Sequence, residues 1–279
     1  MMEIRRLGEQ IGAEIKGVDV RTMCDETFAR IYQAWLDFNV IAVRDQNLSI
    51  EQFLAYSRRF GRLQPHYKKN ANHTEHLEIT VMGVDKFRPD GTLDLDIYAR
   101  GGVGFHTDGA YDAEPFKATQ LYALAIPSRG GDTYFASMYA AYDALPDALR
   151  RRLEGVRATY LVRHHRNDPV PPTEEELRAK SVSHPILARH PETGRNVLYF
   201  DATKVMRIEG TDKAESDALI DELAGYVVQP GAQYTHKWVR GDVVIWDNRC
   251  SFHKAAADYP PEEDRIHWRV SIKETTQVH

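Results

Sequence analysis

Short apolar runs separated by turn residues occur along most of this chain. Runs of four to eight apolar or alternating residues, bounded by glycine, proline, asparagine or aspartate, are typical of strands. The clearest such runs are 39–43, 77–82, 118–126, 133–135, 156–163, 186–188, 197–200, 234–239, 242–246 and 268–272. The pattern predicts a mainly β protein, arranged as an antiparallel sandwich or barrel.

Several segments carry a helical pattern instead. Ser137 caps one that Pro146 interrupts, with a further turn or two over 147–153, and the acidic run 174–176 starts a short solvated helix. The other three are longer or more clearly capped. One begins at Asp25, and another begins at Ser49, where Gln52 three positions later gives a capping-box signature. The third begins at Asp212, with Glu215 as its capping partner, and has one apolar face. These helices lie near the start of the chain and between strands, so we expect them to flank the β core.

Length and composition narrow the class of protein. The 279 residues contain no internal repeat and no linker, which predicts a single domain over residues 1–279. Polar segments near 65–102 and 164–183 are expected to form loops that act as a lid or substrate wall.

Charge, cysteine usage and hydropathy indicate the setting in which the protein works. The net charge of −5 argues against a nucleic-acid partner. Two cysteines, no apolar leader segment and no apolar run of membrane-spanning length favour a reduced, cytoplasmic protein without a membrane partner.

The stretch 104–108 (GFHTD) carries the strongest chemical signal. Residues i and i+2 of a strand point to the same face, so His106 and Asp108 can reach one point in space. They supply two thirds of the 2-His-1-carboxylate ligand set of non-heme Fe(II) oxygenases. We expect His253, just past the strand 242–246, to supply the third ligand. The alternatives are a surface turn with a hydrogen-bonded His–Asp pair and an ordinary core histidine.

Arg265 and Arg269 share one face of the last predicted strand. An inward guanidinium needs an anion, and its planar shape suits a carboxylate. A metal together with an inward arginine implies a chelating ligand with a distal carboxylate, and 2-oxoglutarate has that shape. The alternatives are an ion pair of Arg265 with Glu262, Glu263 or Asp264, and a structural pairing of Arg269 inside the barrel.

In combination and in order, these motifs resemble the TauD/TfdA family of Fe(II)- and 2-oxoglutarate-dependent dioxygenases over nearly the whole chain. The resemblance rests on 12–15, 17–19, 53–61 (FLAYSRRFG), 105–108 (FHTD), 127–133 (PSRGGDT), 140–146 (AAYDALP), 208–210, 246–249 (WDNR), His253, Arg265 and Arg269. It implies a double-stranded β-helix core, the jelly roll of cupin-like proteins, with flanking helices.

The same resemblance implies roles for individual residues. The two histidines and the aspartate of the predicted triad would ligate Fe(II). Thr133 and Arg265 would hold the distal carboxylate of 2-oxoglutarate. Arg269 would lie near this cosubstrate or would face an anionic group of the substrate.

Five further positions fall where substrate-binding residues of the family often lie: His66, Tyr67, Asn70, Gly109 and Tyr111. Gly109 would open space beside the metal, and Tyr111 would offer an aromatic wall with a hydroxyl group. With the anion placed near Arg269 and His66, the expected substrate is a small or medium organic acid.

The implied reaction is hydroxylation of a substrate C–H bond by O2, coupled to oxidative decarboxylation of 2-oxoglutarate to succinate and CO2. Asp108 favours hydroxylation, because related halogenases carry a small residue there. The alternatives are desaturation, epoxidation or cyclisation with the same cofactors, and a non-catalytic jelly-roll binding protein. The intact triad and both arginines favour an enzyme. A homodimer or homotetramer is expected, since both are common in the family.

Overall fold

The computed structural model describes residues 2–65, 73–83, 104–162 and 164–274. The larger sheet contains β1 (Glu3–Arg6), β2 (Ala13–Lys16), β3 (Val40–Val43), β4 (Arg62–Gln64), β5 (Thr80–Met82), β6 (Ala118–Ala125), β14 (Val243–Asp247) and β16 (Ile266–Lys273). Its order is β1-β2-β3-β14-β6-β16-β4, and β5 also pairs with β16. Only the β2–β3 pair of this sheet is parallel within the described residues.

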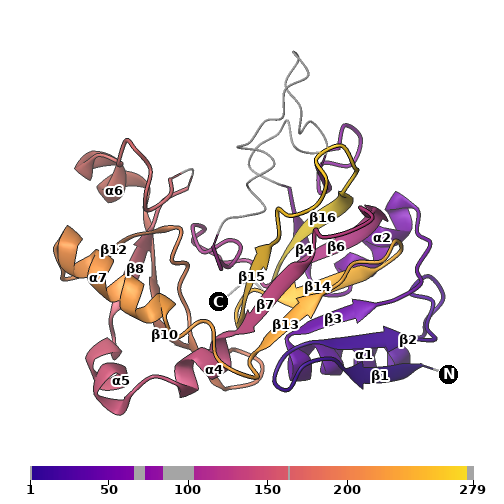
Figure 1. Ribbon diagram of the computed structural model, residues 1–279, viewed down its shortest axis with the longest axis horizontal. Helices are drawn as coiled ribbons and strands as arrows, with labels where there is room; N and C mark the ends of the chain where they lie inside the picture. Colours follow the sequence, from indigo (N-terminus) through magenta and orange to yellow (C-terminus); the bar gives the residue numbers. More distant parts are fainter. Residues whose placement is uncertain (1, 66–72, 84–103, 163, 275–279) are drawn as a thin grey trace.

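A smaller antiparallel sheet faces the larger one (Figure 1). It contains β7 (Thr133–Ser137), β13 (Gln233–His236) and β15 (Ser251–Ala255), in the order β13-β7-β15. Alternation along the strands decides which side chains fill the space between the sheets. Leu121 and Val244 of the larger sheet meet Phe135 of the smaller sheet there. This interior is the place in which the candidate site is built.

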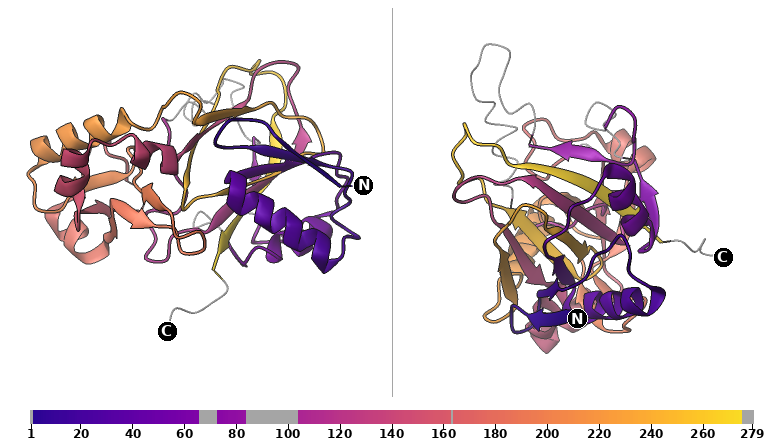
Figure 2. Two further views of the ribbon diagram at one scale, coloured as in Figure 1. Left: turned by 90° about the horizontal axis from the view of Figure 1, so that it is seen from below. Right: turned by 90° about the vertical axis from the view of Figure 1, so that its right-hand side faces the viewer.

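Two helices cover the outer face of the larger sheet: α1 (Asp25–Phe38) and α2 (Ile50–Arg58). Figure 2 shows α1 lying across the strands near the N-terminus. The fully buried Trp35 of α1 packs in the same apolar cluster as Ile245 of β14. The predicted capping box at Ser49 is confirmed, because its side chain accepts a hydrogen bond from the Gln52 N–H group.

The chain between β7 and β13 forms a lobe, seen to the left of the sheets in Figure 1. The lobe contains α4 (Met138–Asp143), α5 (Asp147–Leu153), β8 (Arg157–Tyr160), α6 (Glu174–Lys180), β9 (Val182–Pro185), β10 (Leu187–Arg189), β11 (Asn196–Leu198), β12 (Val205–Ile208) and α7 (Lys213–Ala224). Its strands pair as β12-β8-β9 and β10-β11. Its apolar core includes Leu149, Leu219 and Ile220, and it continues into Ala136 and Phe252 of the smaller sheet.

The predicted fold class, mainly β with flanking helices, is confirmed. The sequence pattern missed β1, β4, β12 and β15. Within the loop expected over 164–183, the short helix predicted from the acidic run 174–176 is confirmed as α6, and β9 also begins there. Much of the segment 65–102 falls outside the described residues. No helix that the structure describes is long and apolar enough to span a bilayer. The single-domain organisation stays a prediction.

A buried ion pair ties the lobe to the sheets at the turn after β14. Asp247 accepts hydrogen bonds from the Arg249 side chain at both carboxylate oxygens, with distances of 2.9 and 2.6 Å. His190 of the lobe reaches the same carboxylate at 3.0 Å, between its Nε2 atom and Asp247 Oδ2. The His190 Nδ1 atom accepts backbone N–H groups, so Nε2 carries the proton that it donates to Asp247.

We predict that Asp247→Asn lowers the free energy of unfolding by at least about 2 kcal/mol, because it leaves the Arg249 charge less well compensated in a buried place. Chemical denaturation measures the change. The matched control is Asp143→Asn, an exposed acid at the end of α4, for which a change below about 0.5 kcal/mol is expected. Equal stability of the Asp247→Asn and wild-type proteins would contradict the prediction.

Candidate functional site

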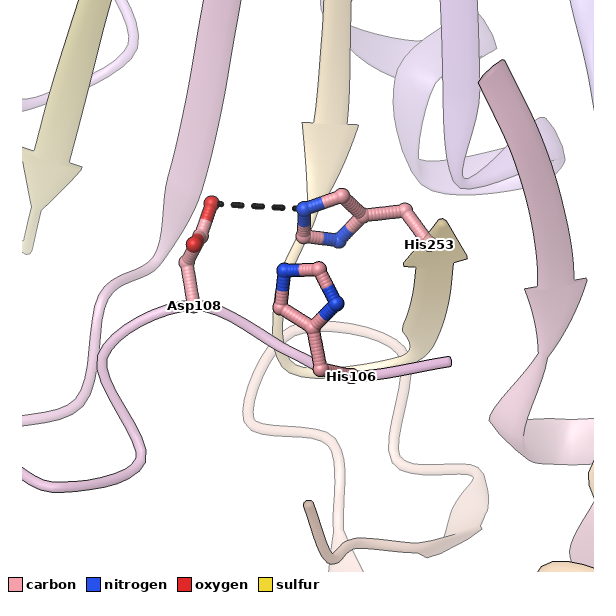
Figure 3. A group of neighbouring side chains, drawn as sticks. All are labelled: His106, Asp108 and His253. Carbon is pink, nitrogen blue, oxygen red and sulfur yellow. Dashed lines mark ion pairs between the residues drawn. The ribbon is translucent and has the colours of Figure 1, made fainter. Parts of the chain in front are cut away.

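A backbone bridge brings His106 and His253 together from distant parts of the chain. The His106 N–H group donates to the His253 carbonyl at 3.1 Å, and the His253 N–H group donates to the His106 carbonyl at 2.8 Å. The centroids of the two rings lie 4.2 Å apart. Figure 3 shows the Asp108 carboxylate pointing toward the same space. The ligand atoms of the three side chains lie within 4.8 Å of one another.

The local structure of the motif differs from the expected strand. Only His106 pairs as an isolated bridge, and a turn begins at Asp108. The two side chains converge because Thr107 is anchored between them, with its hydroxyl donating to the Asn248 carbonyl at 2.7 Å. The prediction that His106 and Asp108 lie on one extended strand was therefore wrong. Their side chains nevertheless reach one point, as expected.

The protonation states of the three groups suit a divalent metal. The His106 Nδ1–H group donates to the Gly104 carbonyl at 3.1 Å, which leaves Nε2 as the free lone pair. Burial, with the neighbouring His106 imidazole, lowers the pKa of His253 to about 3, so this ring is neutral. Burial alone would raise the pKa of Asp108, but Arg269 and the two imidazoles hold it well below the usual range. Two imidazoles and one carboxylate form the donor set of a facial triad.

Several donors fix the Asp108 carboxylate. Its Oδ2 atom accepts the Thr119 hydroxyl at 2.7 Å and lies 2.9 Å from the Arg269 guanidinium and 3.7 Å from His253 Nε2. The Asn248 side chain in turn donates to the Thr119 hydroxyl oxygen at 3.0 Å and accepts from the Asp108 N–H group at 3.4 Å. Asp108 thus cannot rotate away from the two histidines without breaking this network. The sequence patterns did not identify Thr119, and they included Asn248 only as part of the motif 246–249 (WDNR).

Arg265 lies at the other end of the interior and lacks an anion. Arg265 is only 7% exposed, and burial lowers its pKa. Its Nε–H group donates to the Gly131 carbonyl at 2.8 Å, and its Nη2 atom lies 3.4 Å from the Thr133 hydroxyl. Over the described part of the chain no carboxylate lies within ion-pair distance, so the alternative pairing with Glu262, Glu263 or Asp264 is not formed. A buried, unpaired guanidinium costs free energy unless a ligand supplies the anion.

The Thr133 hydroxyl is oriented toward such an anion. Its oxygen accepts the indole N–H group of Trp238 at 3.0 Å and the longer contact from Arg265 at 3.4 Å. Both lone pairs are then engaged, so the hydroxyl proton is available to a further acceptor. Thr133 and Arg265 can therefore donate to one carboxylate. The sequence patterns did not identify Trp238 as part of this site.

Gly131 lets the turn before β7 pass close to Arg265. Its φ angle of +71° lies in the left-handed region. A Cβ atom at this position would lie 3.0 Å from both the Cδ and Nε atoms of Arg265. Any larger residue would therefore displace the guanidinium from the place where it meets Thr133.

Comparison with known proteins identifies the family. The profile described as "Taurine catabolism dioxygenase TauD, TfdA family" matches residues 3–271. The chain belongs to the TauD/TfdA family.

Three relatives and solved structures illustrate the range of TauD/TfdA proteins that this chain resembles. It is 31% identical to an (S)-phenoxypropionate/alpha-ketoglutarate-dioxygenase of Sphingobium herbicidovorans, over 97% of this chain and 94% of the relative. It is also 31% identical to a pentalenolactone F synthase of Streptomyces arenae, over 95% and 93%. The crystal structure of a taurine dioxygenase from Burkholderia xenovorans superimposes with a TM-score of 0.81 at 29% identity, over 98% and 89%.

These findings confirm several predictions from the sequence. The TauD/TfdA family, the jelly-roll core and the enzyme class are as expected. The protein is an iron- and 2-oxoglutarate-dependent dioxygenase, with O2 as its further cosubstrate.

The structure bears differently on each of the residues predicted to bind substrate. His66, Tyr67 and Asn70 lie outside the described residues. Gly109 does not open space beside the metal site as expected, because a Cβ atom there would clash with the ring and backbone of Phe116. Position 109 requires glycine because of this contact with Phe116 and because its φ angle of +79° lies in the left-handed region. Tyr111 is half-buried, with its ring 6.2 Å from that of Phe116, and its substrate role stays a prediction.

A second group with metal-ligand spacing, His190, Asp247 and Cys250, is structural in this TauD/TfdA dioxygenase. Both nitrogens of His190 and both oxygens of Asp247 are already engaged in the hydrogen bonds described above. Burial also raises the pKa of the Cys250 thiol far above its usual range, so it is not a thiolate.

We predict that Asn248→Ala destabilises the metal-binding turn of this dioxygenase. Removing the amide leaves buried donors and acceptors unpaired, which costs about 1–3 kcal/mol in unfolding free energy. Because Asp108 is then held less firmly, the dissociation constant for Mn(II) should rise about tenfold. Denaturation and metal titration measure the two effects. The control is Asn196→Ala, since this exposed amide donates to the Tyr142 hydroxyl at 3.2 Å, away from the triad. Unchanged metal affinity in Asn248→Ala would contradict the prediction.

Proposed function

We propose that His106, Asp108 and His253 hold Fe(II), and that Arg265 with Thr133 holds the distal carboxylate of 2-oxoglutarate. The observation that carries this proposal is the buried Arg265 guanidinium, which has no carboxylate among the described residues and lies beside an available hydroxyl proton. A dicarboxylate that chelates the metal at one end satisfies this charge at its other end. The arrangement supports a cosubstrate site that extends from the triad to Arg265.

The metal and the protein make different contributions to the reaction. Activation of O2 and oxidative decarboxylation of 2-oxoglutarate are the chemistry that Fe(II) supplies when it is bound. The chain supplies two imidazoles, a carboxylate fixed by its hydrogen bonds, and a separate anion site at Arg265. The apolar side chains between the two sheets exclude water from this space, which strengthens the charge interactions within it.

Arg269 has a different position from Arg265. Its guanidinium lies 2.9 Å from Asp108 Oδ2 and therefore compensates the charge of a proposed metal ligand. This contact supports the structural pairing that the sequence left open as an alternative. A contact of Arg269 with 2-oxoglutarate or with a substrate anion stays a prediction.

The substrate of this enzyme is a small molecule. Among its relatives, one is named for (S)-phenoxypropionate and another, 32% identical over 77% of this chain, is named for 2,4-dichlorophenoxyacetate. These are carboxylic acids, and they support a small or medium organic acid as the substrate class here. We further propose C–H hydroxylation as the outcome. A product mass higher by one oxygen atom supports hydroxylation, whereas a loss of two hydrogens indicates desaturation. A cytoplasmic location and a homodimer or homotetramer stay predictions.

We predict that anaerobic addition of Fe(II) and 2-oxoglutarate to the apoprotein produces a weak visible charge-transfer band from the chelated keto acid. His106→Ala should abolish the band, because the triad then lacks one imidazole. The control is His76→Ala, whose imidazole lies 3.7 Å from Glu51 in another part of the structure. A folded wild-type protein that gives no band would refute the proposed cosubstrate complex.

A second prediction concerns Arg265. Arg265→Gln should raise the dissociation constant for 2-oxoglutarate by a factor of about 30 or more, because a buried charge pair is lost. Calorimetric titration in the presence of Mn(II) measures the affinity without turnover. Arg129→Gln is the matched control, since this arginine lies in the same 127–133 segment and is exposed. Equal affinity of the Arg265→Gln and wild-type proteins would show that the distal carboxylate binds elsewhere.

A further inference from the structure

His267 is buried near the start of β16, on the same face of the strand as Arg265 and Arg269. It lies two residues from Arg265 and two from Arg269, and it pairs with Ala123 of β6. Its side chain is fully shielded from solvent. The ring packs edge-on against Trp238, with a distance of 4.4 Å between centroids. This imidazole therefore borders the interior that contains the proposed cosubstrate site.

Neither ring nitrogen of His267 has a hydrogen-bond partner among the residues that the structure describes. The contrast with His236 is direct, because that ring packs against the same indole at 4.5 Å. The Nδ1 atom of His236 lies 2.7 Å from the Tyr234 hydroxyl, and its Nε2 atom lies 3.1 Å from the Asp242 carboxylate. One buried histidine beside Trp238 is fully paired, and the other is fully unpaired.

Packing alone does not account for a histidine at this position. A leucine or phenylalanine would fill apolar space without leaving a buried donor and a buried acceptor unpaired. Buried polar groups are nearly always satisfied, and each exception calls for an explanation, of which a bound ligand, ion or water is one. The unpaired imidazole thus indicates a polar ligand on the inward face of β16.

The position of Trp238 shows which ligand group is in reach. Its indole N–H group donates to Thr133 at 3.0 Å, and its ring lies 6.0 Å from the Arg265 Cζ atom and 4.4 Å from the His267 ring. The three polar side chains therefore surround one indole. Burial and the neighbouring Arg265 charge hold the pKa of His267 well below its usual range, so the ring is neutral and offers one N–H donor.

We propose that His267 donates a hydrogen bond to the distal carboxylate of bound 2-oxoglutarate, beside Arg265 and Thr133. A carboxylate has about four acceptor positions, so it accommodates all three donors. The inference rests on the proposed function, and it adds a cosubstrate-binding residue that the sequence motifs do not include. It also gives the buried imidazole the partner that the protein itself does not supply.

The test is calorimetric titration of His267→Leu with 2-oxoglutarate in the presence of Mn(II), so that no turnover occurs. Loss of one hydrogen bond to a charged group should raise the dissociation constant about 10- to 100-fold. The probe 2-oxopentanoate has the same carbon chain without the distal carboxylate, and its affinity should change less than about threefold. His267→Gln keeps an N–H donor and should bind 2-oxoglutarate more tightly than His267→Leu.

Stability without ligand separates this role from a structural one. His267→Leu should unfold at the wild-type temperature or above it, because no partner in the protein loses a hydrogen bond. His236→Leu, the matched control, should unfold at a lower temperature, because Tyr234 and Asp242 lose theirs. Suppose that His267→Leu and His267→Gln both unfold at a lower temperature than the wild-type protein and bind 2-oxoglutarate with unchanged affinity. His267 would then have a structural role only, and the proposal would be overturned.

Two further outcomes are informative. If His267→Leu binds 2-oxoglutarate as tightly as the wild-type protein does, the proposal for His267 is wrong and the proposed function stands. If both keto acids weaken equally, the substitution has disturbed the whole pocket, and the specific contact with the distal carboxylate is refuted. A wild-type protein that binds no 2-oxoglutarate with Mn(II) would instead refute the proposed function itself.

Discussion

The paired backbone hydrogen bonds between His106 and His253 set the position of the other groups in the candidate metal site. Because these two bonds join the loop before β6 to β15, Thr107 can reach Asn248, and Asn248 can reach Asp108. The side chains that face one another in Figure 3 thus depend on main-chain pairing between segments far apart in sequence. A site fixed in this way is organised before any ligand binds, which reduces the cost of ordering it.

Charge within the interior is arranged unequally. Asp108 is compensated by Arg269, whereas the buried Arg265 has no carboxylate among the described residues. A metal ion bound by the triad would add positive charge at one end of the interior between the sheets. Arg265 already carries a positive charge at the other end. With the metal bound, the interior is therefore suited to an organic ligand with two anionic ends. It is unsuited to an organic cation or to a purely apolar ligand.

A buried polar network supports the anion-binding end. The Asp242 carboxylate accepts from His236 and lies 2.6 Å from Arg44, while Trp238 donates to Thr133. Both His236 nitrogens and the Trp238 N–H group are paired, and such networks hold their members in one arrangement. The unpaired His267 differs from its surroundings for this reason. It lies where a satisfied network ends and a ligand-binding space begins.

The sequence by itself determined the elements and the chemical types of the site. Apolar runs located most strands, the capping boxes at Ser49 and Asp212 located two helices, and the motif residues predicted a triad and an anion-binding arginine. Spacing could not show that Asp108 lies in a turn, that Gly109 is required by Phe116, or that Arg269 pairs with Asp108, because these depend on contacts between distant segments. Only the tertiary structure showed that Trp238 joins Thr133, Arg265 and His267, since strand pairing and sheet packing bring these residues together.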